Sequence, residues 1–524
     1  MTRPRLDRFE LVALAALLAL SVAVLAGLLV RVWTRGGVIT GSDGFLVVDQ
    51  MQYLNWLRQA GEHVTVGNLY DLDPDGPRSF LHPGVLVSGL LNRLGLGVVA
   101  AYMAWKPVAV VALFAAALAW TRRFFARRDD RRLALVLVLF TASPVAAFVG
   151  WSGAGDAHDK LSFDFLGNEM WSGNWLWGYL FTAIAVAMLP LALLAYERAR
   201  GSGSTRALVG AAAAGLVCSW FQPWQGATLA IVLVAGEALA RRHDRAPLGR
   251  SVRDLAVPLA ATAAPLVYYL VLSQTDPAWE LAGTSNDTDT QPRWPVWVTI
   301  VGLAPLAVPA LFAYRLPARD FGQIALRLWP LAALAVFYQP AGTFPFHALQ
   351  GMAFPLAVLA LLAVRERLGE RALPVLPALA VAALLVVPGT LYNGDQMRDA
   401  INRGFQAHFM EPGERNALHH LDREAEAGGV LAPPYLGTAV PAYTGREVWA
   451  GAGSWTPDFV ARSAEANRLF GGELPRPAAE ALVRRSGARF LFSDCHDRAD
   501  VTALLARVTE PPRRFGCATV WRVR

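Results

Sequence analysis

The chain has 524 residues, of which 54% are hydrophobic and only 17% are charged. Largely uncharged runs of roughly 17 to 25 residues, enough to cross a bilayer, recur from Leu11 to Leu391, and this pattern excludes an ordinary soluble protein. The net charge of +7 comes from arginines beside those runs, so it does not indicate nucleic-acid binding.

About eleven segments are expected to cross the membrane as helices. In chain order they are 11–32, 96–120, 133–149, 175–196, 207–221, 226–239, 255–272, 296–314, 328–338, 348–364 and 373–392. The first is too long and too uniformly apolar for an ordinary signal peptide and is expected to be retained. The stretch QPWQG at 222–226 is compatible with a tight external hairpin or with an interruption in one long helix.

The arginines predict the orientation, because Lys and Arg stay in the cytoplasm next to short loops. Arg3, Arg5 and Arg8 precede the first span, and every second loop after it is also rich in Arg. The N-terminus is therefore expected to be cytoplasmic. The outward segments are then 33–95, 150–174, 273–293, 339–347 and everything after Asn393. The bias toward Arg and Ala is typical of a GC-rich bacterial genome, so a bacterial inner or plasma membrane is the expected location.

Two domains are expected. Residues 1–393 form a transmembrane helical bundle with large external loops at 33–95 and 150–174, and residues 394–524 form a small exported soluble α/β domain. In the second domain the pattern predicts strands at 430–432, 488–493 and 518–523 and helices at 414–427, 457–470, 476–486 and 499–508. Cys495 and Cys517 are both in this exported part, where a disulfide can persist, and the sequence leaves their pairing open.

The first external loop carries the acidic pair Asp43 and Asp49 in GSDGFLVVDQMQYLNWLRQAG. Asp43 is a candidate for contacts with the acceptor or with a metal. Apolar Met51, Leu54 and Leu57 predict a short helix at the membrane surface. Asp49 is expected at the N-cap of this helix, where its side chain would accept backbone N–H bonds. The alternative is that the carboxylate points into a cavity as a general base or a metal ligand.

The second external loop is also acidic. Asp156, His158, Asp159 and Glu169 offer oxygen and imidazole donors of the kind that a divalent cation needs, and they are equally candidates for acceptor contacts. The alternative is an ordinary solvated polar loop.

Three cationic side chains are candidates for binding a phosphate. Arg58 lies in the predicted surface helix, Lys106 lies inside the second span, and His347 lies at the outer start of a later span. Intramembrane cations usually face a cavity, although Lys106 can instead snorkel toward the interface and His347 can instead cap its helix.

Together these features resemble the GT-C superfamily of integral-membrane glycosyltransferases, which use polyprenyl-phosphate sugars as donors. The resemblance lies in the multispan bundle, the acidic first loop followed by a surface helix (Asp49-Gln50-Met51-Gln52-Tyr53), the acidic second loop and the C-terminal domain. The family's first loop commonly carries two adjacent carboxylates, one of them a catalytic aspartate. The resemblance implies that Asp49 is this aspartate, while Gln50 replaces the second carboxylate.

This replacement favours single-base catalysis over a metal at the first loop. No cofactor is certain, and Mg²⁺ or Mn²⁺ at the second loop stays open, with chelators expected to have little effect. The expected enzyme is a hexosyl- or pentosyltransferase. It would move a sugar from a polyprenyl-phosphate donor to a cell-envelope glycan, lipid or protein acceptor on the outer face, with no nucleic-acid partner.

A transporter or flippase of a lipid-linked or small polar substrate is the alternative class. Transporters commonly contain inverted repeats and helices broken near the midplane, and no such repeat is visible in the sequence. A non-catalytic scaffold for envelope assembly is a third possibility, favoured if the acidic loops prove dispensable.

Overall fold

The computed structural model describes residues 6–73, 75–244, 247–285, 294–339, 345–404, 407–496 and 498–524. Arg3 and Arg5, and the parts 286–293 and 340–344 of two expected outward loops, lie outside these ranges. The chain forms two compact units. Unit 1 comprises Met1–Ala23, Trp105–Val271 and Gln291–Met397, and unit 2 comprises Val24–Ala104, Leu272–Thr290 and Arg398–Arg524.

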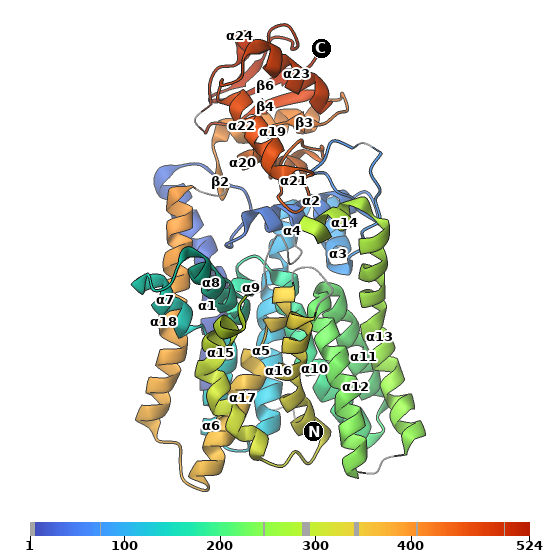
Figure 1. The fold of residues 1–524 in the computed structure, drawn as a ribbon, viewed down its shortest axis with the longest axis vertical. Coiled ribbons are helices and arrows are strands. Elements are labelled where there is room, and N and C mark those ends of the chain that lie inside the picture. Colours follow the sequence, from blue (N-terminus) through green and yellow to red (C-terminus); the bar gives the residue numbers. More distant parts are fainter. Residues whose placement is uncertain are drawn as a thin grey trace. The chain divides into compact units, whose positions relative to one another are not determined.

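Unit 1 is a bundle of helices (Figure 1). Helix α1 (Arg8–Arg35) starts in this unit, and α13 (Leu248–Thr275) and α18 (Val375–Arg403) lie mostly within it. The other elements are α5 (Trp105–Phe124), α6 (Arg128–Phe140), α7 (Pro144–Ser152), α8 (Ala157–Met170), α9 (Ser172–Leu176), α10 (Leu180–Ser202), α11 (Thr205–Phe221), α12 (Pro223–Asp244), α15 (Val296–Leu311), η2 (Phe312–Arg315), α16 (Phe321–Tyr338), η3 (Pro345–Leu349) and α17 (Ala353–Leu368).

Nine helices in the described part of the chain are long and apolar enough to cross a membrane. A tenth span results if α6 and α7, which are bent by 45° at a short break, cross together. Helix α11 is a shorter apolar helix of 17 residues. The nine long helices, the α6/α7 pair and α11 correspond one to one with the expected segments. The predicted class, a polytopic helical membrane protein, is confirmed, while the exact number of spans stays a prediction.

The stretch at 222–226 is a tight hairpin between two helices. Helix α11 ends at Phe221 and α12 begins at Pro223, and Figure 1 shows the two helices side by side. Gly226 packs so closely on α11 that an added Cβ would lie 2.1 Å from Ser219 Oγ. The close approach of the two helices settles the alternative in favour of the hairpin.

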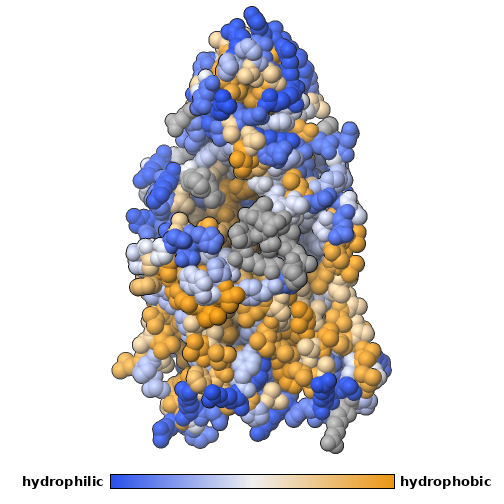
Figure 2. All heavy atoms as spheres, viewed as in Figure 1, coloured by the Kyte–Doolittle hydropathy of each residue, from blue (hydrophilic) through white to orange (hydrophobic). Residues whose placement is uncertain are grey.

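The outside of the bundle is apolar, while ion pairs join its helices near their Arg-rich ends. Figure 2 shows apolar residues gathered over this surface, and Val267, Leu270 and Leu311 are each more than half exposed, as expected of side chains that face lipid. The ion pairs are Arg122–Glu10 (2.7 Å), Arg123–Glu197 (2.6 Å), Arg200–Glu237 (2.7 Å) and Arg365–Asp130 (2.6 Å). Each pair links two different helices and compensates a charge that is at most one-third exposed.

Unit 2 combines the loop that follows α1 with the segment Leu272–Thr290 and the C-terminal residues. Its helices are α2 (Val47–Ala60), α3 (Pro83–Leu91), η1 (Asn92–Leu96), α4 (Val98–Met103), α14 (Pro277–Ser285), α19 (Pro412–Arg423), α20 (Pro434–Gly437), α21 (Val440–Thr444), α22 (Phe459–Phe470), α23 (Arg476–Ser486) and α24 (Thr502–Leu505). Helix α2 packs against α21, and the Tyr70 hydroxyl donates to the Thr438 carbonyl at 2.7 Å. The predicted boundary between residues 393 and 394 stays a prediction.

A four-stranded sheet forms the centre of the C-terminal part, in the order β3-β4-β6-β5. The strands are β3 (Val430–Leu431), β4 (Phe490–Ser493), β5 (Arg513–Phe515) and β6 (Ala518–Arg522). The β3/β4 pair is parallel and the other two pairs are antiparallel, while β1 (Val38–Ile39) pairs with β2 (Phe409–Met410) elsewhere in unit 2. Leu431, Leu482, Leu491 and Trp521 lie in the buried core beside this sheet.

Three of the four strands coincide with the segments expected as strands, while β5 was not expected. The helix expected at 499–508 is only the single turn α24. The helix expected at 414–427 is α19, which begins at Pro412 after the capping box of Glu411 and Glu414. Cys495 and Cys517 form a disulfide with a Cα–Cα distance of 5.1 Å, which answers the pairing left open by the sequence.

Candidate active site

Asp49 lies in the first turn of α2 and is exposed. The expectation that Asp49 is the N-cap is wrong, because the helix begins two residues earlier and Leu46 is the N-cap, with no side-chain cap bond. Val47 is fully buried, and this packing draws it and Val48 into the helix. The helix dipole still favours a carboxylate in the first turn. The charge of Asp49 is therefore favourable at this position although Asp49 does not cap the helix.

Gln50 organises the loop that precedes α2. Its Oε1 accepts the backbone N–H of Asp43 at 2.9 Å, and both residues have no exposed surface. Asp43 is therefore a buried residue of the loop, whereas Asp49 is solvent-accessible. Gln50, the residue that departs from the family's pair of carboxylates, has a structural function at this position.

Burial favours the neutral forms of Tyr53, Tyr70 and His82 in the first loop. Burial, and secondarily the charge of Asp49, raises the pKa of Tyr53. Burial also raises the pKa of Tyr70, against the opposing effect of its bond to Thr438. Burial lowers the pKa of His82 to about 3, and His82 Nδ1 accepts the Val85 N–H at 3.2 Å as the N-cap of α3.

Arg58, at the C-terminal end of α2, is tied to the C-terminal part of unit 2. Its guanidinium pairs with the Asp422 carboxylate and also donates to the Tyr443 carbonyl at 3.1 Å. The side chain is 31% exposed. Its role as a donor-phosphate ligand stays a prediction, and a phosphate would have to compete with Asp422 for it.

In unit 1, the start of α8 brings together Asp156, His158 and Asp159. One possible ligand atom from each lies within 4.8 Å of the others. Asp156 is the N-cap of α8, and its Oδ1 accepts the Asp159 N–H at 2.8 Å. Two carboxylates and an imidazole form a donor set suited to Mn²⁺ or Zn²⁺, and with added water to Mg²⁺. The residues therefore fit a divalent cation.

Glu169 is not part of that cluster but pairs with His347. His347 Nδ1 lies 3.1 Å from Glu169 Oε2 and 2.9 Å from Gln350 Nε2, and the Glu169 side chain is only 7% exposed. Gln225 Nε2 donates to the carbonyls of His347 (2.7 Å) and Gln350 (3.1 Å). These contacts hold the imidazole ring of His347 in one orientation.

Lys106 is held by the backbone of unit 1. It is 5% exposed, and its Nζ donates to the carbonyls of Ser21 (3.0 Å) and Leu176 (2.5 Å). These bonds account for an ammonium group buried in the bundle and link α5 to α1 and α9. A donor-phosphate role for Lys106 stays a prediction.

A second group of possible metal ligands was missed in the sequence. Glu414, Asp494 and His496 approach one another in unit 2, although Glu414 precedes Asp494 by 80 residues in the chain. Glu414 accepts the N–H groups of Glu411 (2.6 Å) and Cys495 (2.7 Å), while Asp494 accepts from Arg498 at 2.7 Å. These bonds make the two buried carboxylates structural groups. Only the fold places α19 beside the end of β4.

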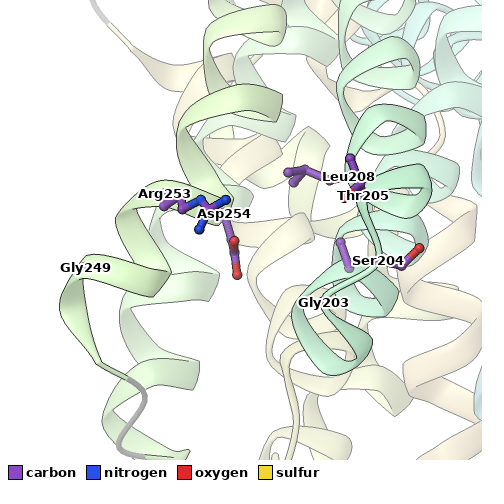
Figure 3. Close-up of a pocket in the computed structure, with 8 residues that line it drawn as sticks. Gly203, Ser204, Thr205, Leu208, Gly249, Arg253 and Asp254 are labelled. Atoms are coloured by element: carbon purple, nitrogen blue, oxygen red, sulfur yellow. The ribbon is translucent and has the colours of Figure 1, made fainter.

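A cavity of about 570 Å³ lies among the ends of α10, α11 and α13 (Figure 3). Arg253 and Asp254 line it from α13, and Gly203, Ser204 and Thr205 line it from the junction of α10 and α11. The Ser204 hydroxyl caps α11. The lining contains none of the expected site residues, and the adjoining loops are those predicted to be cytoplasmic.

The chain shares its multispan helical fold with solved structures of other proteins, and at their low sequence identity this likeness concerns the fold alone. The chain is similar to the oligosaccharyltransferase AglB from Archaeoglobus fulgidus, in complex with an inhibitory peptide and a dolichol-phosphate, with 14% identity, a TM-score of 0.54 and coverage of 95% of this chain and 71% of that one. It is also similar to ArnT from Cupriavidus metallidurans bound to undecaprenyl phosphate, with 13% identity, a TM-score of 0.50 and coverage of 95% and 97%. No protein-family model and no curated protein matches the sequence.

Proposed function

We propose that this protein is a membrane glycosyltransferase that moves a sugar from a polyprenyl-phosphate donor to an envelope acceptor. The observation that carries the proposal is the exposed carboxylate of Asp49 on α2, in a chain with the GT-C fold. The similar proteins AglB and ArnT bind dolichol-phosphate and undecaprenyl phosphate, respectively. A long polyprenyl chain suits an enzyme whose helical surface is apolar.

The reaction forms one bond and breaks one bond. The acceptor oxygen attacks the anomeric carbon, the bond from that carbon to the phosphate oxygen breaks, and polyprenyl phosphate leaves with the electron pair. Asp49 accepts the proton of the acceptor hydroxyl, a contribution worth roughly 10²- to 10⁴-fold. Its exposure in the first turn of α2 allows a substrate hydroxyl to reach it.

The leaving phosphate needs hydrogen-bond donors or positive charge. His347 is one candidate for this role, because its contact with Glu169 holds the imidazole ring in one orientation. Arg58 is a second candidate, although its guanidinium is paired with Asp422. Lys106 is a third candidate, whose ammonium group is already bonded to two carbonyls.

Asp156, His158 and Asp159 would hold a divalent cation at the second loop. When bound, a cation supplies positive charge to substrate oxygens. A structure of the similar Archaeoglobus fulgidus oligosaccharyltransferase is a complex with zinc and sulfate. Binding is tested by equilibrium dialysis with Mn²⁺. Wild type should retain the ion and Asp159→Asn should not, whereas equal retention would remove this site.

The protein is proposed to reside in a bacterial cell membrane with the C-terminal part of unit 2 outside. Two observations support this orientation. Arginines are concentrated in alternate loops, and the disulfide between Cys495 and Cys517 is of a kind that persists in oxidising compartments.

The test is a reconstitution in liposomes with a radiolabelled polyprenyl-phosphate sugar and a panel of acceptors. A transferase releases polyprenyl phosphate in proportion to the labelled product. A flippase moves the intact donor across the bilayer and releases none. Transport without release of polyprenyl phosphate would contradict the proposal.

A further inference from the structure

Four aromatic side chains from three distant segments meet in unit 2. Trp56 of α2 packs on Phe80 at 4.5 Å between ring centroids, and Trp279 of α14 packs on Phe80 at 4.9 Å. Trp455 lies edge-on to Trp56 at 5.4 Å and to Trp279 at 5.2 Å. The planes of Trp56 and Trp279 are nearly parallel, with an interplanar angle of 9°. We name these four residues the aromatic cluster.

Hydrogen bonds fix the positions of the segments that contribute the cluster. Asp276 Oδ1 accepts the N–H groups of Ala278 (2.8 Å) and Trp279 (3.2 Å), and Asp276 Oδ2 accepts from the Ser79 hydroxyl, one residue before Phe80. The Trp455 carbonyl accepts from Asn68 Nδ2 at 2.7 Å. The indole rings are therefore held in place before any ligand arrives.

The cluster is not a completely buried core. Trp56 and Phe80 are buried, whereas Trp279 and Trp455 are each only half-buried. A membrane anchor would differ in environment, as Trp33 at the end of α1 does with 86% exposure. Trp455 lies in the C-terminal part of the chain, outside every helix apolar enough to cross a membrane. Partly exposed indoles on a fixed apolar floor are suited to stacking against a ligand.

A polar group lies between this cluster and Asp49. Residues 49, 52 and 56 are spaced by three and four positions, so they share one side of α2, with Asp49 about 10 Å along the axis from Trp56. Gln52 is 3% exposed, and its Nε2 has no hydrogen-bond partner among the described residues. A buried amide donor without a partner is costly, and a ligand oxygen would satisfy it.

We infer that the aromatic cluster binds the sugar rings of a carbohydrate acceptor, so that the enzyme extends a glycan. This inference rests on the proposed function and specifies the acceptor. A pyranose ring has an apolar C–H face, which stacks on indole, and a rim of hydroxyl oxygens, which can accept from Gln52 Nε2. The terminal sugar would then present its hydroxyl to Asp49 while the preceding rings lie against the partly exposed Trp279 and Trp455.

The test measures binding of a panel of neutral oligosaccharides to the full-length protein in nanodiscs, by saturation-transfer NMR and tryptophan fluorescence. Wild type should bind at least one of them, and Trp279→Ala and Trp455→Ala should each weaken its binding about fivefold to tenfold. Trp279→Phe should restore most of the affinity, and Trp33→Ala should leave it unchanged. No binding by any oligosaccharide, or alanine variants that bind like wild type, would overturn the inference.

Two further measurements separate a structural cluster from a binding site. Thermal unfolding shows whether the alanine variants remain folded. The inference is wrong if binding weakens only in variants that also unfold and if Trp279→Phe does not restore it. Transfer assays separate it from the proposed function. If a peptide or a lipid accepts sugar and the acceptor KM of Trp279→Ala is unchanged, the enzyme assignment stands and the carbohydrate acceptor is wrong. If an oligosaccharide binds at the aromatic cluster but no sugar is transferred, the cluster is a carbohydrate-binding site and the enzyme assignment is wrong.

Discussion

Gln50 Oε1 accepts the backbone N–H of Asp43 at 2.9 Å, and this bond ties a buried part of the loop after α1 to the helix that carries Asp49. It explains why an amide is tolerated beside Asp49. Gln50→Ala would leave the buried N–H of Asp43 without this acceptor, and we expect it to lower the free energy of unfolding by about 1 to 3 kcal/mol. Gln50→Met keeps the length of the side chain but has no oxygen acceptor, so it should also lose stability. Thermal unfolding in detergent measures both variants, and a Gln50→Met variant as stable as wild type would show that the bond is unimportant.

Lys106 offers a test of structure against substrate binding. Lys106→Met removes both bonds to the carbonyls of Ser21 and Leu176, so we expect a loss of about 1 to 3 kcal/mol in stability. If Lys106 is structural, the folded fraction of the variant should keep the donor KM of wild type. An increase of the donor KM by tenfold or more, with unchanged thermal stability, would instead identify Lys106 as a phosphate ligand.

Glu447 predicts a pH dependence of stability. Burial, and then the charges of Asp73 and Asp71, raise its pKa from 4.5 to about 7. The folded state then holds this proton more tightly than the unfolded state, so stability falls as the pH rises from 4.5 to about 7. Glu447→Gln should remove the penalty and stabilise the protein at pH 8 by about 1 kcal/mol after allowance for solvent screening. Unfolding temperatures at pH 5 and pH 8 check this, and an equal effect at both would contradict it.

The orientation can be tested by cysteine labelling in intact cells, in a background without the native cysteines. A cysteine at Asp129, whose side chain is 82% exposed, should be protected from an impermeant thiol reagent, whereas one at Ser285 should react. Labelling at Asp129 would reverse the orientation.

The disulfide provides a separate check on the compartment. In the wild type, Cys495 and Cys517 should become reactive only after reduction. Replacing both with Ser should cost about 3 kcal/mol in stability. Two freely reactive thiols in protein taken from untreated cells would argue against an oxidising location.

The helices that cross the membrane could be predicted from sequence because lipid requires long apolar runs, whatever the tertiary contacts. The start of α2 could not be predicted, because Leu46 has no side chain that can cap a helix and Val47 joins the helix through its burial. The separate features of the candidate site were visible as residue types. Their pairings were not, since Glu169 with His347 and Trp56 with Trp279 and Trp455 depend on segments far apart in the chain. The sequence offered one signal for the contacts of His347, namely the polar Gln350 within an apolar stretch.

The central claim is that Asp49 is the base for sugar transfer, and Asp49→Asn tests it most directly. The amide keeps the size of the carboxylate but cannot take a proton, so transfer from a polyprenyl-phosphate sugar in liposomes should fall by about 10²-fold or more. Thermal stability should be unchanged, and Asp75→Asn, at an exposed acid of the same loop, should transfer like wild type. Turnover near wild type in Asp49→Asn would contradict the account and remove Asp49 from the mechanism.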